Sequence, residues 1–226
     1  MSTFLQLVQR TGTECGISGT ITNVATATGE WARVVNWVNS AYEDIQLDNP
    51  EWEWMRKNVT FNTVAQQNTY SPVTDLLLTD FASWKDSSFR IYNQAQGVGT
   101  ESLLGFRDYD SFRDFYLLSS TKTTYAQPTE ITIAPNKDLM LGMSPDAVYV
   151  VSGEYYKLPV TLSANADVPD MPARFHLAIV YKAMMSYGGY ESAVEVYQRG
   201  ESQYKSFMNK IRYDQMPAIT RGSSLI

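Results

Sequence analysis

The chain has 226 residues, of which 44% are hydrophobic and 19% charged, and this is enough for one domain of ordinary size or one domain with a large insertion. Its 18 basic and 24 acidic residues give a formal charge of −6, which disfavours tight binding to nucleic-acid phosphates because that binding needs clustered Lys and Arg. A single cysteine, Cys15, excludes an internal disulfide and a multi-cysteine zinc site, and a single histidine, His176, excludes most histidine-based metal sites.

The first residues do not have the basic opening and apolar run of a signal peptide. No stretch approaches the roughly 18 consecutive apolar residues that a membrane helix needs. We therefore expect an intracellular protein without a membrane segment.

Two helices are predicted near the N-terminus. Residues 4–15 repeat apolar side chains at steps of three and four, and Thr3 with Gln6 fits a capping box. A Thr-rich loop follows, and Thr28 can cap a second helix, which Asn49 and Pro50 end. The second helix is the best-defined element because one of its faces carries Trp31, Val34, Val35, Val38, Ala41, Tyr42 and Ile45.

The middle of the chain has the period of two that is typical of strands. Residues 59–63 alternate, residues 65–68 form a turn and residues 69–72 return, which predicts a β-hairpin. A short aromatic helix is predicted over residues 109–118. Further strands are predicted over residues 88–92, 103–106, 130–134, 138–143 and 147–156.

Two more helices are predicted near the C-terminus. Residues 173–187 are apolar on more than one face, which indicates burial between other helices. Gly188 and Gly189 then predict a turn, and the last helix runs from Tyr190 through Gly200, a candidate kink.

The order of these elements predicts an α+β fold. Helices from both ends of the chain, residues 1–55 and 170–213, would form a helical bundle. A β-rich insertion with one short helix would occupy residues 56–169. Residues 214–226 have no period and would form an extended C-terminal tail.

Three patterns could carry chemistry, and each has a simpler structural interpretation. His176 could be a general base, but its apolar helical neighbours favour a packed or interfacial histidine. The segment 97–102 lacks the third glycine of a dinucleotide-binding fingerprint and reads as a loop. Two groups of acidic residues could form paired acids or a metal site: Asp44, Asp48, Glu51 and Glu53, and Asp108, Asp110 and Asp114. Neither group has the spacing of a calcium loop, so a solvated rim is favoured for both.

The aromatic content is more informative. Fifteen tyrosines and five tryptophans exceed what one core requires, and both residue types suit interfaces because each has an apolar body and a polar group. A tyrosine-rich core with scattered surface rings is the alternative. We assign no catalytic residue, no cofactor and no metal site, and we predict a protein that acts by assembly.

Several segments resemble the head-to-tail adaptor (connector) proteins of tailed bacteriophages. The likeness is strongest over the first third of the chain, and the order of elements is similar over the full length. The residues that carry it are GEWARVVNWVNSAYEDIQ (29–46), PEWEWMR (50–56), the helix end CGISG (15–19) and the return QQNTY (66–70).

This resemblance implies a homo-oligomeric ring, usually of twelve copies, that lies beneath the portal and leaves a channel for DNA. The helices would surround the channel, and the C-terminal extension would insert between portal subunits. By position, the portal-docking residues in this chain would be Met216, Ile219, Arg221, Leu225 and Ile226. Candidates for the ring interface are Trp31, Trp37, Trp52, Trp54 and Arg212, and Arg212 is also a candidate partner for portal carboxylates.

The implied partners are the portal protein, further tail or nozzle proteins and other copies of the chain, with DNA passing without sequence-specific binding. The implied location is the virion neck, after synthesis in the host cytoplasm. Two other functions stay open. A cell-wall-active or carbohydrate-active tail protein would need a carboxylate pair about 5–9.5 Å apart. A packaging factor would leave before the virion matures.

Overall fold

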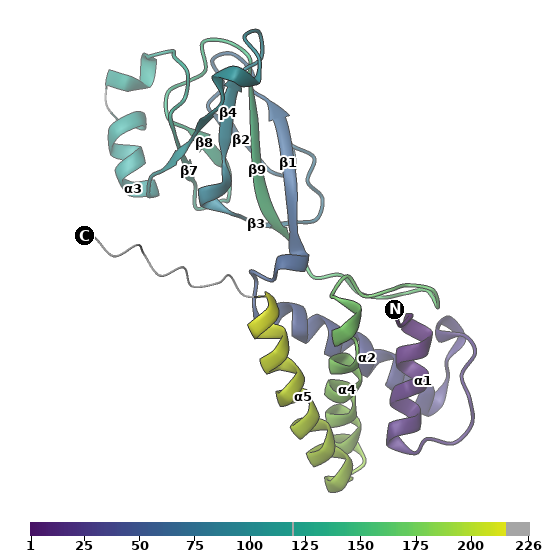
Figure 1. Cartoon of the computed structure of the whole chain (residues 1–226). Coiled ribbons are helices and arrows are strands. Elements are labelled where there is room, and N and C mark those ends of the chain that lie inside the picture. Colours follow the sequence, from purple (N-terminus) through teal and green to yellow (C-terminus); the bar gives the residue numbers. More distant parts are fainter. Residues whose placement is uncertain (119, 216–226) are drawn as a thin grey trace. The chain divides into compact units, whose positions relative to one another are not determined.

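The computed structural model describes residues 1–118 and 120–215 and divides the chain into two units. One unit, here called the helical unit, combines Met1–Met55 with the chain from Pro159 onward, and the other, the β unit, comprises Arg56–Leu158 (Figure 1). The α+β class is confirmed. The calls on Met216, Ile219, Arg221, Leu225 and Ile226 lie outside the described residues.

Local sequence signals account for the ends of the first helix, α1 (Phe4–Cys15). The Thr3 hydroxyl accepts from the Gln6 backbone N–H, and the Gln6 side chain accepts from the Thr3 N–H, so the predicted capping box is confirmed. Gly16 ends the helix in the left-handed conformation, at φ 74°. Helix α2 (Gly29–Asp48) begins after Thr28 as predicted, but the Thr28 side chain makes no capping hydrogen bond.

Helix α4 (Leu177–Tyr190) lies against α1, α2 and α5 (Val194–Gln215), and this explains its apolar character on several faces. The predicted turn at Gly188 and Gly189 is wrong, because both residues belong to α4. The predicted tail also begins too early, since Asp214 and Gln215 are the last residues of α5. Short 3-10 turns at Val24–Thr26, Glu53–Met55 and Ala173–Phe175 complete the helical unit.

Residues 159–169, which the sequence places in the β-rich insertion, lie in the helical unit because they bond to α2 and α1. Asn39 pairs with the backbone of Leu162 and Gln46 with that of Val160, each side chain donating once and accepting once. The Phe4 N–H donates to the carbonyl of Asp167 at 2.7 Å. The two α2 amides thus tie down a segment that has no regular structure of its own.

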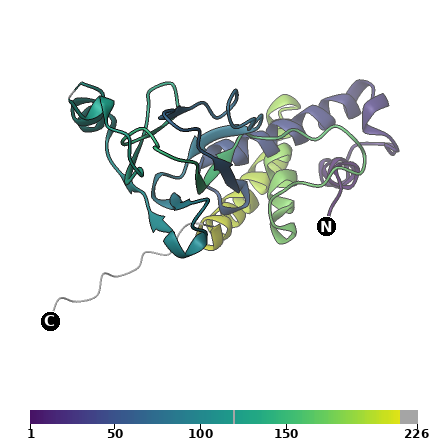
Figure 2. The ribbon, with the colours of Figure 1, turned by 90° about the horizontal axis from the view of Figure 1, so that it is seen from above.

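The β unit contains two sheets (Figures 1 and 2). The first has the order β1-β9-β4-β5, and β3 also pairs with β9. Its strands are β1 (Arg56–Asn62), β3 (Phe81–Trp84), β4 (Arg90–Asn93), β5 (Ser102–Leu103) and β9 (Tyr149–Lys157). The second has the order β2-β8-β7-β6, with strands β2 (Thr69–Tyr70), β6 (Gly105–Phe106), β7 (Glu130–Ile133) and β8 (Leu139–Leu141). Their apolar faces share one core.

The predicted hairpin between residues 59–63 and 69–72 is wrong. β1 pairs antiparallel with β9 over its whole length, from Arg56 opposite Tyr156 to Asn62 opposite Val150. β2 pairs instead with β8 in the other sheet. The Tyr70 hydroxyl donates to the Gln67 carbonyl and accepts from the Val64 N–H, so the predicted turn connects two sheets.

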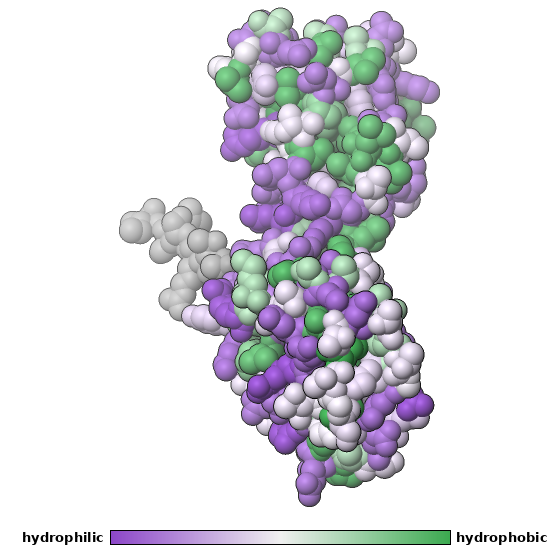
Figure 3. Space-filling view, turned by 90° about the vertical axis from the view of Figure 1, so that its right-hand side faces the viewer, coloured by the Kyte–Doolittle hydropathy of each residue, from purple (hydrophilic) through white to green (hydrophobic). Residues whose placement is uncertain are grey.

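The short aromatic helix is confirmed as α3 (Tyr109–Phe112), which continues as a π-helical turn over Arg113–Leu117. It lies at the periphery of the β unit in Figures 1 and 2. The remaining 3-10 turns of this unit are Asp86–Ser88, Val98–Thr100 and Ser120–Thr123. Part of the apolar connection between β2 and β3 stays at the surface, and Figure 3 shows a hydrophobic patch on the upper, β unit.

Candidate functional site

An exposed aromatic surface lies where α2 and α4 pack together. We define this α2–α4 aromatic surface by Arg33 and Trp37 on α2 and Tyr187 and Tyr190 on α4. The Trp37 ring meets Tyr187 edge-on at 5.9 Å between centroids and meets Tyr190 at 5.6 Å. The Arg33 guanidinium lies over the Tyr190 ring at 4.6 Å, and Tyr190 is 55% exposed.

The helical repeat explains why these four side chains meet. Arg33 and Trp37 are four residues apart on α2, and Tyr187 and Tyr190 are three apart on α4, so each pair lies on one face of its helix. Burial raises the pKa of the Tyr187 hydroxyl, with Glu30 a smaller contribution, so this hydroxyl stays neutral. Trp, Tyr and Arg are the residues that most often dominate protein–protein interfaces. This surface is therefore suited to binding protein.

Trp31 is only half-buried and packs over α1. A Cβ atom added at Gly12 would lie 2.3 Å from the Trp31 ring, so this glycine permits the close contact. The exposed part of the ring lines a hollow of about 330 Å³ together with Ile17 and Thr20. The exposed part of Trp31 is thus accessible to another molecule.

Trp52 is fully buried, and this corrects its assignment to a subunit interface. Its indole Nε1–H donates to the Ile45 carbonyl at 2.8 Å, and its ring stacks on Trp54 at 4.6 Å. Trp54 is partly exposed, but its indole nitrogen is buried and finds no hydrogen-bond acceptor among the described residues. Trp52 is therefore a core residue, whereas Trp54 keeps some surface.

Arg212 belongs to a row of ion pairs between helices of the helical unit. Its guanidinium donates to the Asp48 carboxylate at 2.8 Å, and Lys182 approaches Asp44 at 3.3 Å. Burial, with smaller contributions from Asp48 and Asp44, raises the pKa of Tyr204 to about 12. Asp44 and Asp48 are therefore ion-paired within the protomer but remain exposed, as do Glu51 and Glu53, so the predicted solvated rim is confirmed.

His176 is a packed histidine, as its apolar neighbours predict. The Ser2 backbone N–H donates to Nδ1 at 3.2 Å, and Nε2 lies 3.0 Å from the Met171 carbonyl. The two contacts fit one neutral tautomer with the proton on Nε2. Burial lowers the pKa of the imidazole below its ordinary value. With both ring nitrogens engaged and only 1% of the residue exposed, His176 is not placed to act on a substrate.

The other chemical candidates also have structural roles. Gly97 has a φ of 80° and starts a short 3-10 turn, so the glycine pair lies in a loop, as predicted. The Asp108 carboxylate caps α3 by accepting from the Ser111 N–H. Within residues 1–118 and 120–215, no cluster of three or more His, Cys, Asp or Glu side chains is placed to hold a metal ion.

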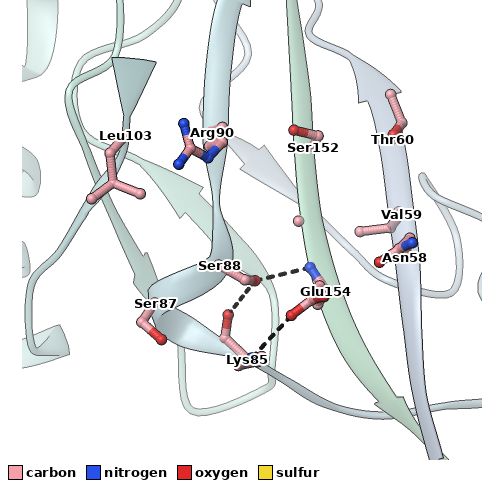
Figure 4. Close-up of a pocket in the computed structure, with 11 residues that line it drawn as sticks. Asn58, Val59, Thr60, Lys85, Ser87, Ser88, Arg90, Leu103, Ser152 and Glu154 are labelled. Carbon is pink, nitrogen blue, oxygen red and sulfur yellow. Dashed lines mark hydrogen bonds and ion pairs between the residues drawn. The ribbon is translucent and has the colours of Figure 1, made fainter. Parts of the chain in front are cut away.

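A polar groove of about 470 Å³ lies on the outer face of the first sheet (Figure 4). Thr60, Ser152 and Arg90 form a row across three strands. Lys85 bonds the Glu154 carboxylate at 3.0 Å, and the Ser88 hydroxyl accepts from the Glu154 N–H and donates to the Lys85 carbonyl. These polar groups hold the sheet and the preceding turn together.

The comparisons with known proteins point in the same direction as the surfaces. The family model described as "SU10 adaptor protein" matches residues 2–223, which is nearly the whole chain. The chain belongs to the SU10 adaptor protein family. The comparison with curated proteins found no match. The family match confirms the resemblance to phage adaptor proteins.

Membership of this adaptor family makes the chain a structural phage protein and implies contacts with portal and tail proteins. In the described part of the adaptor, none of the helices has the length and apolar character to cross a membrane. Of the four residues of the α2–α4 aromatic surface, the sequence singled out Trp37 but not Arg33, Tyr187 or Tyr190. The i, i+4 and i, i+3 spacings were visible signals, but the packing of α2 on α4 is what joins them.

Proposed function

We propose that this adaptor forms a homo-oligomeric ring, of twelve copies by resemblance to its family, between the portal and the tail. The observation that carries the proposal is the family match over residues 2–223. The net charge of −6 per chain fits a channel through which DNA passes without sequence-specific binding, since phosphate contacts need clustered cations. The ring would lie in the virion neck.

The α2–α4 aromatic surface is our proposed contact between neighbouring copies. A ring contact is heterologous, so this surface would meet a different surface of the next copy. Trp37 and Tyr190 offer rings that are still partly exposed in the protomer, and truncation of a central aromatic residue in an interface typically costs about 2 kcal/mol or more. Trp31, Trp54 and Arg212 remain candidates through their exposed parts, and Trp52 does not.

The experiment is native mass measurement with negative-stain imaging of the full chain, alone and mixed with its cognate portal. Tyr190→Ala should weaken ring assembly at least tenfold. Tyr125→Ala is the matched control, because Tyr125 is exposed to nearly the same extent (52%) but lies in the β unit. Failure of the wild-type chain to form a ring, with or without portal, would refute the proposed function.

We also propose that residues 216–226 dock on the portal, with Met216, Ile219, Leu225 and Ile226 as apolar anchors and Arg221 as a partner for carboxylates. The structure indicates where to truncate. Gln215 is buried and Arg174 pairs with Asp214, so removal of residues 216–226 keeps every described residue of α5, whereas a cut after Tyr213 would remove both of these contacts. The truncated chain should lose affinity for the portal but keep the wild-type thermal transition. Unchanged portal affinity would refute this role.

A further inference from the structure

Strand β1 is paired on one side only. Its register with β9 is continuous from Arg56 to Asn62, and the Thr63 N–H extends the ladder to the Tyr149 carbonyl at 2.8 Å. Residues bonded to the partner strand alternate with residues that are not. Lys57, Val59 and Phe61 therefore point their backbone groups toward β9. The backbone groups of the other residues point to the open edge: Arg56, Asn58, Thr60 and Asn62.

The other side of β9 supports this assignment. The Glu154 N–H donates to the Ser88 hydroxyl, and the Glu154 carbonyl accepts from the Lys85 N–H, so Glu154 does not bond to Asn58 opposite it. All four residues with outward backbone groups are exposed, and no hydrogen-bond partner is found for those groups among the described residues. β1 thus offers a regular row of unpaired donors and acceptors.

The remaining sheet edges in the described chain are short or covered. β2, β5 and β6 have two residues each. The free side of β3 is blocked, because the Lys137 ammonium donates to the Ala82 carbonyl and the Trp84 indole donates to the Lys137 carbonyl. Natural proteins protect open edges with bulges, prolines or charges. β1 has no bulge and no proline, and its charged residues, Arg56 and Lys57, are confined to one end.

The end of β1 and the connection from β2 to β3 carry apolar side chains that the protomer does not bury. Val64 follows β1, and Val73 and Leu77 lie on the connection from β2 to β3; all three are exposed. Leu77 is 76% exposed and adopts a φ of 55°, a conformation that is costly for a leucine. The turn at Leu77 lets its neighbours Leu76 and Leu78 pack against the core, while the Leu77 side chain itself stays exposed and available to a second molecule.

We propose that β1 pairs antiparallel with β1 of a second copy about a two-fold axis at Val59. In this register Arg56 faces Asn62 and Asn58 faces Thr60, so every residue with outward backbone groups meets another such residue. Lys57 faces Phe61, and no like charges are opposed. Among the described residues, β1 is the only strand of more than two residues whose second edge makes no hydrogen bond, so a second copy offers no other strand of matching length.

A two-fold contact closes on itself and gives a dimer, because both copies use the same surface. The pairing is therefore a property of the free chain and is independent of the proposed ring, whose contacts are heterologous. The two β units would share one continuous sheet, as in strand addition at an exposed edge.

The first test is disulfide trapping in the full chain carrying Cys15→Ala. At a non-hydrogen-bonded antiparallel pair the Cα atoms are about 4.5 Å apart, which lies within the range of about 4.4–6.8 Å that a disulfide spans. Val59→Cys should therefore form a covalent dimer rapidly under mild oxidation. Phe61→Cys is the matched control, because its two copies would be about 13 Å apart along the strands. Equal or absent trapping of the two variants would overturn the proposal.

The second test is the mass of the free chain at micromolar concentration by analytical ultracentrifugation. Wild type should be dimeric. Thr60→Pro removes one outward N–H that the β1–β9 ladder does not use, so it should shift the chain at least tenfold toward monomer. Thr60→Val keeps that N–H and should remain dimeric. A wild-type monomer, or a dimer equally stable in both variants, would refute β1 pairing whether or not a ring forms with portal.

Discussion

Gly188 and Gly189 are consecutive residues of α4, and alanine should have opposite effects at the two positions. A Cβ atom at Gly188 would lie 2.7 Å from the Tyr197 backbone nitrogen and 2.9 Å from its Cα. These atoms belong to α5, so the side chain cannot be accommodated unless one helix moves. A Cβ atom at Gly189 would meet nothing within 4 Å. The close approach of α4 and α5 thus depends on the first glycine and not on the second.

The magnitudes follow from two terms. Replacing glycine by alanine inside a helix stabilises it by about 0.5–1 kcal/mol, and this is the whole effect at Gly189, reduced somewhat because α4 ends at Tyr190. Overpacking a close contact costs about 1–3 kcal/mol, which exceeds the helical gain at Gly188. We therefore expect Gly189→Ala to stabilise the helical unit by about 0.5 kcal/mol and Gly188→Ala to destabilise it by about 1–2 kcal/mol.

Denaturant unfolding followed by tryptophan fluorescence measures the free energy of unfolding of the wild type and of the two glycine variants. Four of the five tryptophans lie in the helical unit, and only Trp84 lies in the β unit, so the signal reports mainly on the helices. Thermal unfolding should show a shift of about 2–4 °C per kcal/mol. If Gly188→Ala is as stable as wild type, or if Gly189→Ala is destabilised equally, then the α4–α5 contact is not as close as the structure indicates.

Three further predictions concern single side chains. Trp52→Phe should lower the free energy of unfolding by about 1–2 kcal/mol, because it deletes a satisfied hydrogen bond to Ile45. Trp54→Phe should leave the free energy of unfolding unchanged or raise it, because it removes a buried donor that has no acceptor among the described residues. Equal losses for the two variants in denaturant unfolding would contradict this. Burial lowers the pKa of His176 from 6.5, so the unfolded chain binds the proton more readily and stability should fall as pH drops below about 6.5. His176→Gln should flatten this dependence between about pH 7 and 5.5, and an unchanged slope would exclude the histidine as its source. Leu77→Asn should raise the melting temperature of the β unit, since asparagine tolerates a positive φ and no buried contact is lost; a decrease would show that Leu77 stabilises the protomer.

The helices could be predicted because their signals are local. The capping box of Thr3 and Gln6 and the apolar stripe of α2 each lie within a few turns of chain, and the structure confirms both helices. The end of α4 shows the limit of such signals. Gly188 reads as a turn in sequence, but it is helical because its small size lets α5 approach, and that partner is visible only in three dimensions.

Strand pairing could not be predicted, because it is decided far along the chain. Residues 59–63 and 69–72 alternate and are joined by turn residues, which favours a hairpin. β1 instead pairs with β9, about ninety positions later, and that pairing buries Val59 and Val151 in one core. Strand β3 was missed altogether, since four residues beginning at Phe81 give too short a pattern to separate from a loop.

Residue type alone did not separate surface from core among the tryptophans. Trp37 lies in an uncharged stretch of α2 and Trp52 lies between two glutamates, yet Trp37 keeps exposed surface and Trp52 has none. The difference is where each ring finds a polar partner. The Trp52 indole reaches the Ile45 carbonyl at the end of α2, which lets it be buried completely, whereas Trp37 packs its ring against two tyrosines at the surface.

The two surfaces proposed for contact make different demands on symmetry. The four residues that define the α2–α4 aromatic surface include Arg33 but no acidic partner for it, so this surface suits a heterologous contact, which can repeat around a ring. The β1 edge matches itself residue by residue and closes as a pair. A ring without two-fold axes cannot satisfy the β1 edge by self-pairing. If both contacts exist, the free dimer must open, or another polypeptide must fill the edge, when the ring assembles.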